Sequence, residues 1–137
     1  MPAQATDLRV ADLMTIDPIV VSDDASIEDA EELLRRNQIT GLPVVDPAGR
    51  LVGVISQTDV LYLAMPSVQA LIRHRASGIR VGEVMSTPPV TIDSGATLRE
   101  AASRMYTDRL HRLVVVDSHG RPIGVISAMD FLALATE

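Results

Sequence analysis

The sequence predicts a mixed α/β (α+β) fold. Two tandem copies of a β-α-β-β-α unit are expected to be related by a pseudo-two-fold axis, with their sheets packed together and helices outside. The main observation is an internal repeat: residues 10–61 align with residues 81–132 without a gap, and 17 of the 52 aligned positions are identical. Self-similarity at a fixed period indicates a duplicated supersecondary unit. One copy is small for a stable core of its own, so the copies are expected to share one.

Each copy carries the same order of local signals. A short β-rich run precedes an amphipathic helix, and each helix opens with a capping-box pair, Ser26/Asp29 and Thr97/Glu100. Two strand-like runs joined by a turn that begins with Asp and ends with Gly predict a β-hairpin, and a final apolar helix follows. The strands are predicted at 19–21, 42–45, 51–55, 90–92, 113–116 and 123–126, and the last helices begin near Ser56 and Ser127.

These signals predict repeat 1 over residues 10–65, a connecting helix or linker over 66–80 and repeat 2 over 81–136, with a loose tail before residue 10. The last helix of each copy is apolar all round, as in Val60–Met65 and Phe131–Ala135. Such a helix is buried on more than one side. A small chain has little interior for two of them, so a second protomer is expected to cover part of this surface, forming a homodimer. The alternative is that both helices are simply core.

Composition excludes several classes of function. The 137 residues carry a net charge of −6 and no lysine, so neither nucleic-acid binding by bulk electrostatics nor lysine chemistry is expected. The absence of cysteine excludes disulfides, zinc–thiolate sites and cysteine nucleophiles, and it fits a cytoplasmic protein. No apolar run is long enough to span a membrane, and no secretory signal precedes the first copy. The three histidines show no metal-ligand spacing, so no metal is predicted.

The most informative local motif is Gly-x-x-Ser-x-x-Asp, which occurs over 53–59 and again over 124–130. One interpretation is structural: the serine and aspartate form a capping box, and a cap of this kind stabilises a helix by about 1 kcal/mol. The other is functional. A helix N-terminus with a serine hydroxyl can hold a phosphate, the aspartate can accept hydrogen bonds from ribose hydroxyls, and the glycine lets a ligand approach the backbone. The residues alone leave both interpretations open.

Together, these features resemble tandem CBS (cystathionine β-synthase) domains, also called a Bateman module. The resemblance covers residues 10–65 and 81–136. It rests on the two Gly-x-x-Ser-x-x-Asp motifs, the leading segments 10–15 and 81–86, and the strand segments 42–46 and 110–117. It implies a regulatory module, not an enzyme, that needs no cofactor. Such a module binds an adenine nucleotide (AMP, ADP or ATP, with S-adenosylmethionine also possible) in clefts between the copies and signals to an effector protein.

The resemblance also assigns residues. Ser56 and Ser127 would contact phosphate, and Asp59 and Asp130 would contact the ribose hydroxyls. Positions in the leading segments and in the strand before the hairpin would flank the base: Thr15, Ile19, Thr40, Pro43, Thr87 and Val90.

The two copies differ in the charge that they offer a phosphate. Copy two has His111-Arg112, similar to the pair in the nucleotide-sensing γ subunit of AMP-activated protein kinase, whereas copy one has the uncharged Thr40-Gly41. Because a lysine-free acidic chain needs a local cation to bind phosphate, the stronger site is expected around Ser127, Asp130, Arg112 and His111. Copy two also departs from the family pattern, since Val114 stands where copy one has Pro43.

Two other classes of function compete with a regulatory module. A structural dimerisation protein would use the serine and aspartate only as caps and would bind no nucleotide. An enzyme, such as a nucleotide hydrolase using His111, is disfavoured because neither paired carboxylates nor a nucleophile–base pair is evident. The effector is expected to be a separate chain, unless the sequence is part of a longer one.

Overall fold

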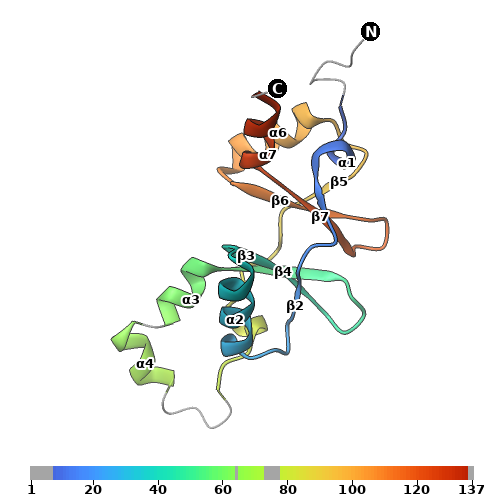
Figure 1. Cartoon of the computed structure of the whole chain (residues 1–137). Helices are drawn as coiled ribbons and strands as arrows, with labels where there is room; N and C mark the ends of the chain where they lie inside the picture. Colours follow the sequence, from blue (N-terminus) through green and yellow to red (C-terminus); the bar gives the residue numbers. More distant parts are fainter. Residues whose placement is uncertain (1–7, 64, 73–77, 136–137) are drawn as a thin grey trace. The chain divides into compact units, whose positions relative to one another are not determined.

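The computed structural model of the chain describes residues 8–63, 65–72 and 78–135 (Figure 1). The chain forms two compact units: unit 1 combines residues 1–18 with 90–137, and unit 2 spans residues 19–89. The chain passes between them after Pro18 and after Pro89, which occupy equivalent positions in the two repeats. The predicted mixed α/β class, with two β-α-β-β-α repeats, is confirmed.

Each unit combines the leading segment of one repeat with the remaining elements of the other. Unit 1 contains α1 (Val10–Leu13), β1 (Thr15–Ile16), β5 (Thr91–Asp93), α6 (Leu98–Asp108), β6 (Arg112–Val116), β7 (Pro122–Ser127) and α7 (Ala128–Ala135). Unit 2 contains β2 (Val21–Ser22), α2 (Ile27–Asn37), β3 (Gly41–Val45), β4 (Leu51–Ser56), α3 (Gln57–Leu63), α4 (Pro66–Ile72) and α5 (Val81–Val84).

The sheets follow the same plan in both units. The order is β1-β7-β6-β5 in unit 1 and β2-β3-β4 in unit 2. In both units the strand before the long helix is parallel to the strand after it and the hairpin strands are antiparallel, and in unit 1 β1 also pairs antiparallel with β7. The predicted hairpin turns form as expected. Asp46 Oδ1 accepts hydrogen bonds from the Ala48 and Arg50 N–H groups at 2.9 Å each, and Gly49 adopts φ 83°. Asp117 and Gly120 repeat this turn in unit 1.

The leading segments are exchanged between the repeats, which the sequence did not reveal. The segment 8–16 of repeat 1 packs in unit 1, where Thr15 and Ile16 pair with β7, and the segment 79–86 of repeat 2 packs in unit 2. The Val10 N–H donates to Ala96 O at 2.8 Å, and the equivalent Val81 N–H donates to Ala25 O at 2.9 Å. Neither repeat of the sequence therefore forms a unit by itself.

The described residues form two cores, one in each unit, and not the single shared core that the sequence predicted. The exchange of leading segments completes both cores. Val10 and Val81 are both fully buried, Val10 in the core of unit 1 and Val81 in that of unit 2. The other buried members of the two core clusters are Leu98, Ala101, Met105, Leu113, Val115 and Ile126 in unit 1, and Val21, Ala30, Leu34, Leu42, Val44 and Ile55 in unit 2. With so few aromatic residues in the chain, aliphatic side chains supply the packing.

The glycines of the two repeated motifs make the exchange possible. A Cβ on Gly53 would lie 2.5 Å from Met85 Sδ and 2.9 Å from Ser86 O, and one on Gly124 would lie 2.7 Å from Met14 Sδ and 2.9 Å from Thr15 O. The sequence suggested that a ligand approaches the backbone at these glycines. That suggestion is wrong, because the leading segment of the other repeat occupies the space in each unit.

A proline explains why β2, predicted over residues 19–21, is shorter than its counterpart β5. β5 pairs with β6 at three positions beginning at Thr91↔Val114, whereas β2 pairs with β3 only from Val21↔Val44. The missing pair would involve Pro43, which has no N–H to donate to a ladder. Ile19 and Val20 consequently lie outside the strand and are exposed.

The helix ends follow their predicted caps. Ser26 Oγ accepts from the Asp29 N–H at 3.1 Å and Thr97 Oγ1 from the Glu100 N–H at 3.0 Å. In the segment 66–80, α4 begins at Pro66, and residues 73–77 lie outside the described part of the chain. No helix in the described ranges is long and apolar enough to cross a membrane.

Residues 1–7 of the loose tail predicted before residue 10 lie outside the described residues. Leu8 packs against the core of unit 1, and Arg9 forms a β-bridge with Thr97. These two residues are therefore held in place, contrary to the prediction.

Substituting the motif glycines tests whether the leading segments pack directly against them. Gly53→Ala and Gly124→Ala are expected to lower the free energy of unfolding by about 1–3 kcal/mol each, because the added methyl group overpacks a site occupied by a methionine and a backbone carbonyl. Gly95→Ala is the control, since its Cβ would meet only the Asp93 carboxylate, at 3.0 Å. Urea unfolding monitored by circular dichroism measures the three variants, and equal losses would contradict the packing argument.

The turn of the second hairpin predicts an acid-dependent loss of stability. Hydrogen bonds from backbone N–H groups, that of Arg121 first and that of His119 next, hold the pKa of Asp117 below its ordinary value. A lowered pKa in the folded state stabilises the fold above the ordinary value, and this contribution disappears as pH falls through the lowered pKa. Asp117→Asn keeps an Oδ1 acceptor that does not titrate. Its stability should therefore fall less steeply than that of the wild type below about pH 4, and parallel unfolding curves would contradict this.

Candidate functional site

The serine and aspartate of each repeated motif contact one another at the start of the last helix. In unit 2, Asp59 Oδ2 accepts from the Ser56 N–H at 2.8 Å and from Ser56 Oγ at 3.0 Å, and the Asp59 N–H donates to Ser56 Oγ at 3.2 Å. In unit 1, Asp130 Oδ2 accepts from the Ser127 N–H at 2.7 Å and from Ser127 Oγ at 3.2 Å. Both halves of the capping box thus form in unit 2, whereas in unit 1 the contacts are those that the Asp130 carboxylate accepts from Ser127.

The cap leaves part of each motif available. Ser127 and Asp130 are half-buried, and within the described residues Asp130 Oδ1 accepts no hydrogen bond. This oxygen can accept from a ligand hydroxyl or amide. The helix offers less to an anion than the sequence suggested, because the Ala128 N–H already donates to His111 O at 2.9 Å. The Gln57 N–H donates likewise to Thr40 O at 2.8 Å in unit 2.

The neighbouring cations of repeat 2 are placed differently. Arg112 lies directly opposite Ser127 in the β6–β7 register, so their side chains share one face of the sheet. Arg112 is half-buried and already interacts with other residues of the chain. His111 is exposed and lines a hollow with residues from the end of α6. The structure therefore brings Arg112, rather than His111, alongside the serine of the motif.

Two further residues predicted for the site belong to unit 1. Thr15 is exposed on β1 opposite Val125, two residues before Ser127. Val90 is half-buried just before β5 and packs against the core of the unit. Unit 1 thus contains Thr15, Val90, His111, Arg112, Ser127 and Asp130.

The other six predicted residues belong to unit 2: Ile19, Thr40, Pro43, Ser56, Asp59 and Thr87. Thr87 is exposed and follows Ser86, whose N–H donates to Val54 O at 2.8 Å. Thr40 and Ile19 are exposed, whereas Pro43 is buried on β3. Each unit therefore combines a Ser/Asp motif from one repeat with a leading-segment threonine from the other.

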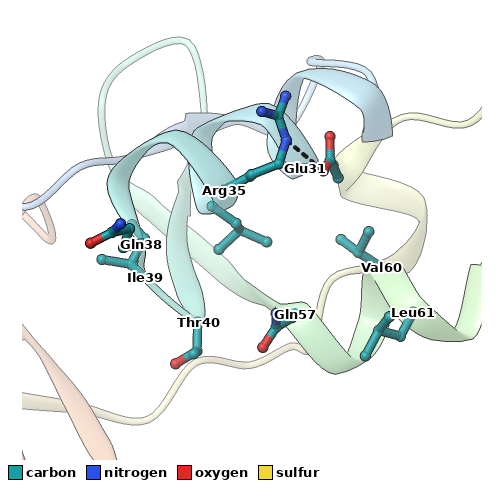
Figure 2. A pocket seen from close by; sticks show the side chains of 9 residues that line it. Glu31, Arg35, Gln38, Ile39, Thr40, Gln57, Val60 and Leu61 are labelled. Atoms are coloured by element: carbon teal, nitrogen blue, oxygen red, sulfur yellow. Dashed lines mark hydrogen bonds and ion pairs between the residues drawn. The ribbon is translucent and has the colours of Figure 1, made fainter.

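A groove lies between α2 and α3 of unit 2, with a volume of about 430 Å³ (Figure 2). We call it the α2–α3 groove. Its apolar lining residues are Leu34, Ile39, Val60 and Leu61, and its polar ones are Glu31, Arg35, Gln38, Thr40 and Gln57. Figure 2 shows the Glu31–Arg35 ion pair, of 3.1 Å, along its α2 side.

Unit 1 has a hollow at the corresponding place. It is lined by Met105, Tyr106, Thr107, Arg109, Leu110 and His111, at a volume of about 780 Å³. Tyr106 and Arg109 belong to none of the motifs that predicted the site. The repeat alignment was the signal that could have revealed them, because it places them opposite Arg35 and Gln38. In the described ranges, no three His, Asp or Glu side chains are grouped to hold a metal ion.

The family model of the CBS domain matches residues 10–65 and 81–137. The chain belongs to the CBS domain family. Among its relatives, inosine-5′-monophosphate dehydrogenase of Mycobacterium leprae is 33% identical over 87% of this chain, which spans only 21% of that enzyme. Protein MJ1426 of Methanocaldococcus jannaschii is 30% identical, with 84% of each chain covered. The chloroplastic CBS domain-containing protein CBSX1 of Arabidopsis thaliana is 31% identical over 79% of this chain and 55% of its own length.

Solved structures of CBS pairs share the fold and hold adenosine compounds. CBSX2 of Arabidopsis thaliana in complex with AMP superposes with a TM-score of 0.81 at 35% identity, covering 93% of this chain and 96% of that one. The CBS pair of MJ0100, with 5′-methylthioadenosine and S-adenosylmethionine, gives 0.76 at 26% identity and coverages of 93% and 99%. The cytosolic domain of the magnesium channel MgtE, with ATP, gives 0.72 at 28% identity and coverages of 89% and 46%.

Proposed function

We propose that this CBS pair is a regulatory module without catalytic activity that binds an adenosine-containing ligand at its Ser/Asp motifs. The observation that carries the proposal is the half-buried Asp130, whose Oδ2 is held by the cap while Oδ1 remains open to a donor. A ribose diol offers two such donors. The complexes of similar CBS pairs with AMP, with 5′-methylthioadenosine and S-adenosylmethionine, and with ATP support adenosine as the shared element of the ligand.

The two units are proposed to differ in how they receive a phosphate. The Ala128 N–H is engaged with His111 O, so side chains must supply most of the stabilisation of an anion. Unit 1 places Arg112 on the sheet face of Ser127, and arginine binds phosphate in bidentate fashion. Unit 2 has Gly41 opposite Ser56. A phosphorylated ligand such as AMP, ADP or ATP is therefore assigned to unit 1, and a ligand without phosphate suits unit 2.

One observation favours a second candidate function, a structural dimerisation module that binds no small molecule. Both serine hydroxyls already donate to the aspartates, at 3.0 and 3.2 Å, so the motifs have a structural use without any ligand. Under this alternative, loss of Asp130 weakens the helix and nothing else.

Thermal unfolding with AMP, ATP, S-adenosylmethionine and 5′-methylthioadenosine in turn separates these functions. A ligand at about 100 times its dissociation constant stabilises the native state by about 2.7 kcal/mol, several degrees in a protein of this size. We expect AMP or ATP to raise Tm of the wild type and of Asp59→Ala. We expect Asp130→Ala to abolish the rise.

The quantity to compare is the change in Tm that the ligand causes in each variant. The absolute Tm is not comparable, because either substitution also removes cap hydrogen bonds and so lowers the stability of the ligand-free protein. No shift with any ligand would contradict the regulatory proposal and leave the dimerisation module. A shift that survives in Asp130→Ala and disappears in Asp59→Ala would move the phosphate-binding site to unit 2.

We also propose that the chain is a homodimer through α3 and α7. Leu61 and Leu132 occupy equivalent positions on these helices and are 63% and 58% exposed, and Met129 is 70% exposed. Apolar side chains gathered on a helix face mark an interaction surface. We further propose that an effector protein recognises the ligand-bound state of the module. A cytoplasmic location is also proposed, in keeping with the absence of cysteine.

Sedimentation velocity tests the dimer directly. The 14.7 kDa chain should sediment as a dimer, and the pair Leu61→Asp with Leu132→Asp should shift it to monomer, because burying two carboxylates in an apolar interface is unfavourable. Leu71→Asp is the control, since Leu71 is exposed to a similar or greater extent, at 72%, but lies on α4. A wild-type monomer, or dissociation by the control alone, would contradict the assignment.

A further inference from the structure

Methionine supplies all the sulfur in this chain, which has six methionines and no cysteine. The repeat alignment pairs two of them with each other, Met14 and Met85, and it pairs each of the others within its range with a different residue type. Met14 directly follows α1 and Met85 directly follows α5. Both repeats therefore bring a thioether to the contact between a leading segment and a motif strand.

Each of these two sulfurs lies against the backbone of a motif glycine. A Cβ on Gly53 would lie 2.5 Å from Met85 Sδ, and one on Gly124 would lie 2.7 Å from Met14 Sδ. The carbonyl oxygen of the residue after each methionine shares that space, at 2.9 Å from the same Cβ position. The space over each glycine therefore has no room for a further heavy atom.

The exposure of these two methionines differs from that of the others in the described ranges. Met14 and Met85 are half-buried, and they pack against the cores of unit 1 and unit 2. Met65 and Met129 are 49% and 70% exposed, whereas Met105 is only 7% exposed. Methionine oxidation adds a polar oxygen and disrupts apolar packing. Half-buried methionines in a close contact are both open to a small oxidant and sensitive to that oxygen.

We propose that Met14 and Met85 are oxidation sites at which hydrogen peroxide loosens the leading segments. The sulfur lone pair attacks one peroxide oxygen, so that an S–O bond forms and the O–O bond breaks. The proton on the transferred oxygen passes to the departing hydroxide. Thioether and peroxide become sulfoxide and water, with the sulfur oxidised by two electrons and the peroxide reduced by two.

The contact in each unit is unsuited to a sulfoxide. In unit 2, the Val54 N–H already donates to Ser86 O at 3.1 Å, and the Ser86 N–H donates to Val54 O at 2.8 Å. A sulfoxide oxygen over Gly53 would therefore meet the Ser86 carbonyl, another acceptor, in a space that is already filled. If the side chain instead turns away, the methionine loses its packing on the glycine. Either result weakens the hold on the leading segment.

Loosening a leading segment affects both the core and the site of its unit. Val10 and Thr15 belong to the segment that enters unit 1, whereas Val81 enters the core of unit 2 and Thr87 follows its segment. Oxidation thus lowers the stability of each unit without any ligand. It also lowers the affinity for an adenosine compound, an effect that rests on the proposed function.

Peroxide treatment of the ligand-free chain tests the proposal. We call Met14→Leu with Met85→Leu the contact variant, and Met65→Leu with Met129→Leu the exposed-site control. Leucine nearly conserves the volume of methionine and resists oxidation, so both variants should fold. Peptide mass spectrometry measures the sulfoxide at each position, and exposure is stopped while Met105 remains unoxidised.

We expect oxidation to lower Tm of the wild type and of the exposed-site control by several degrees. Tm of the contact variant should remain nearly unchanged. Methionine sulfoxide reductase should return the oxidised wild type to its original Tm, because the modification is reversible.

Amide hydrogen exchange gives a readout within each unit and needs only single substitutions. The Val10 N–H donates to Ala96 O at 2.8 Å, and the Val81 N–H donates to Ala25 O at 2.9 Å. Oxidation of the wild type should speed exchange at both amides, because local opening exposes them. Met14→Leu should preserve protection at Val10 alone, and Met85→Leu at Val81 alone.

The inference fails if Met14 and Met85 stay unoxidised until Met105 reacts, since the contacts are then closed to the oxidant. An equal fall of Tm in the contact variant would assign the loss to other methionines. Complete sulfoxide formation at both positions, with Tm and exchange unchanged, would show that the contacts tolerate the oxygen. Absence of an AMP- or ATP-induced rise in Tm before oxidation would contradict the proposed function alone, so the two failures are distinguishable.

Discussion

The close approach of a leading segment to a motif glycine is the constraint on which the rest of the structure depends. Met85 packs directly on Gly53 and Met14 on Gly124, at distances that no Cβ would permit. These segments carry Val81 and Val10, which lie fully buried in the two cores. A side chain at either glycine would displace the segment and, with it, a central core residue. The repeat of the glycine in both copies thus has a packing cause that holds without any ligand.

The same contact ties the motif to the rest of the chain. Each glycine stands three residues before a serine that caps the following helix, on the same strand that the leading segment joins. Thr15 of repeat 1 lies beside β7 of repeat 2, and Thr87 of repeat 2 follows the bridge to β4 of repeat 1. A ligand that touched both the motif and the leading segment in one unit would contact both repeats. Such a ligand would couple its binding to the folding of both repeats, because each unit is built from both.

The sequence was sufficient where local physical chemistry decides the structure. Hairpin turns with Asp46 and Asp117, caps at Ser26 and Thr97, and the apolar spacing of α2 and α6 all act over a few residues, and all were predicted. The exchange was not predictable in the same way. Val10 and Val81 are equivalent and identical, so either one satisfies the hydrophobic pattern of either core. A repeat alignment reveals which segments are alike, not which copy each one completes.

The predicted site shows the same division. The pairing of Ser127 with Asp130 followed from the motif, because a capping box is local. The motif did not predict that His111 and Arg112 would be placed differently. Their placement depends on the register Arg112↔Ser127, which puts Arg112 on the sheet face of Ser127 and leaves His111 outside the strand. Pro43 was predicted to flank a base, and its effect on β2 could have been anticipated from its missing N–H.

The cap hydrogen bonds also set a condition on any signal. Ser127 Oγ already donates to Asp130 Oδ2 at 3.2 Å, so a phosphate that took the serine hydroxyl would replace a contact that holds the start of α7, whereas a ribose hydroxyl could use Asp130 Oδ1 without replacing it. A ligand shifts an equilibrium only by the difference in its affinity for two states, and one that binds both equally shifts nothing. In unit 1, Arg112 can join the serine in holding a phosphate, whereas unit 2 has Gly41 at that register position. A phosphorylated ligand would therefore bind unit 1 more tightly than unit 2. Such a difference in affinity is what would allow the ligand to favour one conformation of the chain over another.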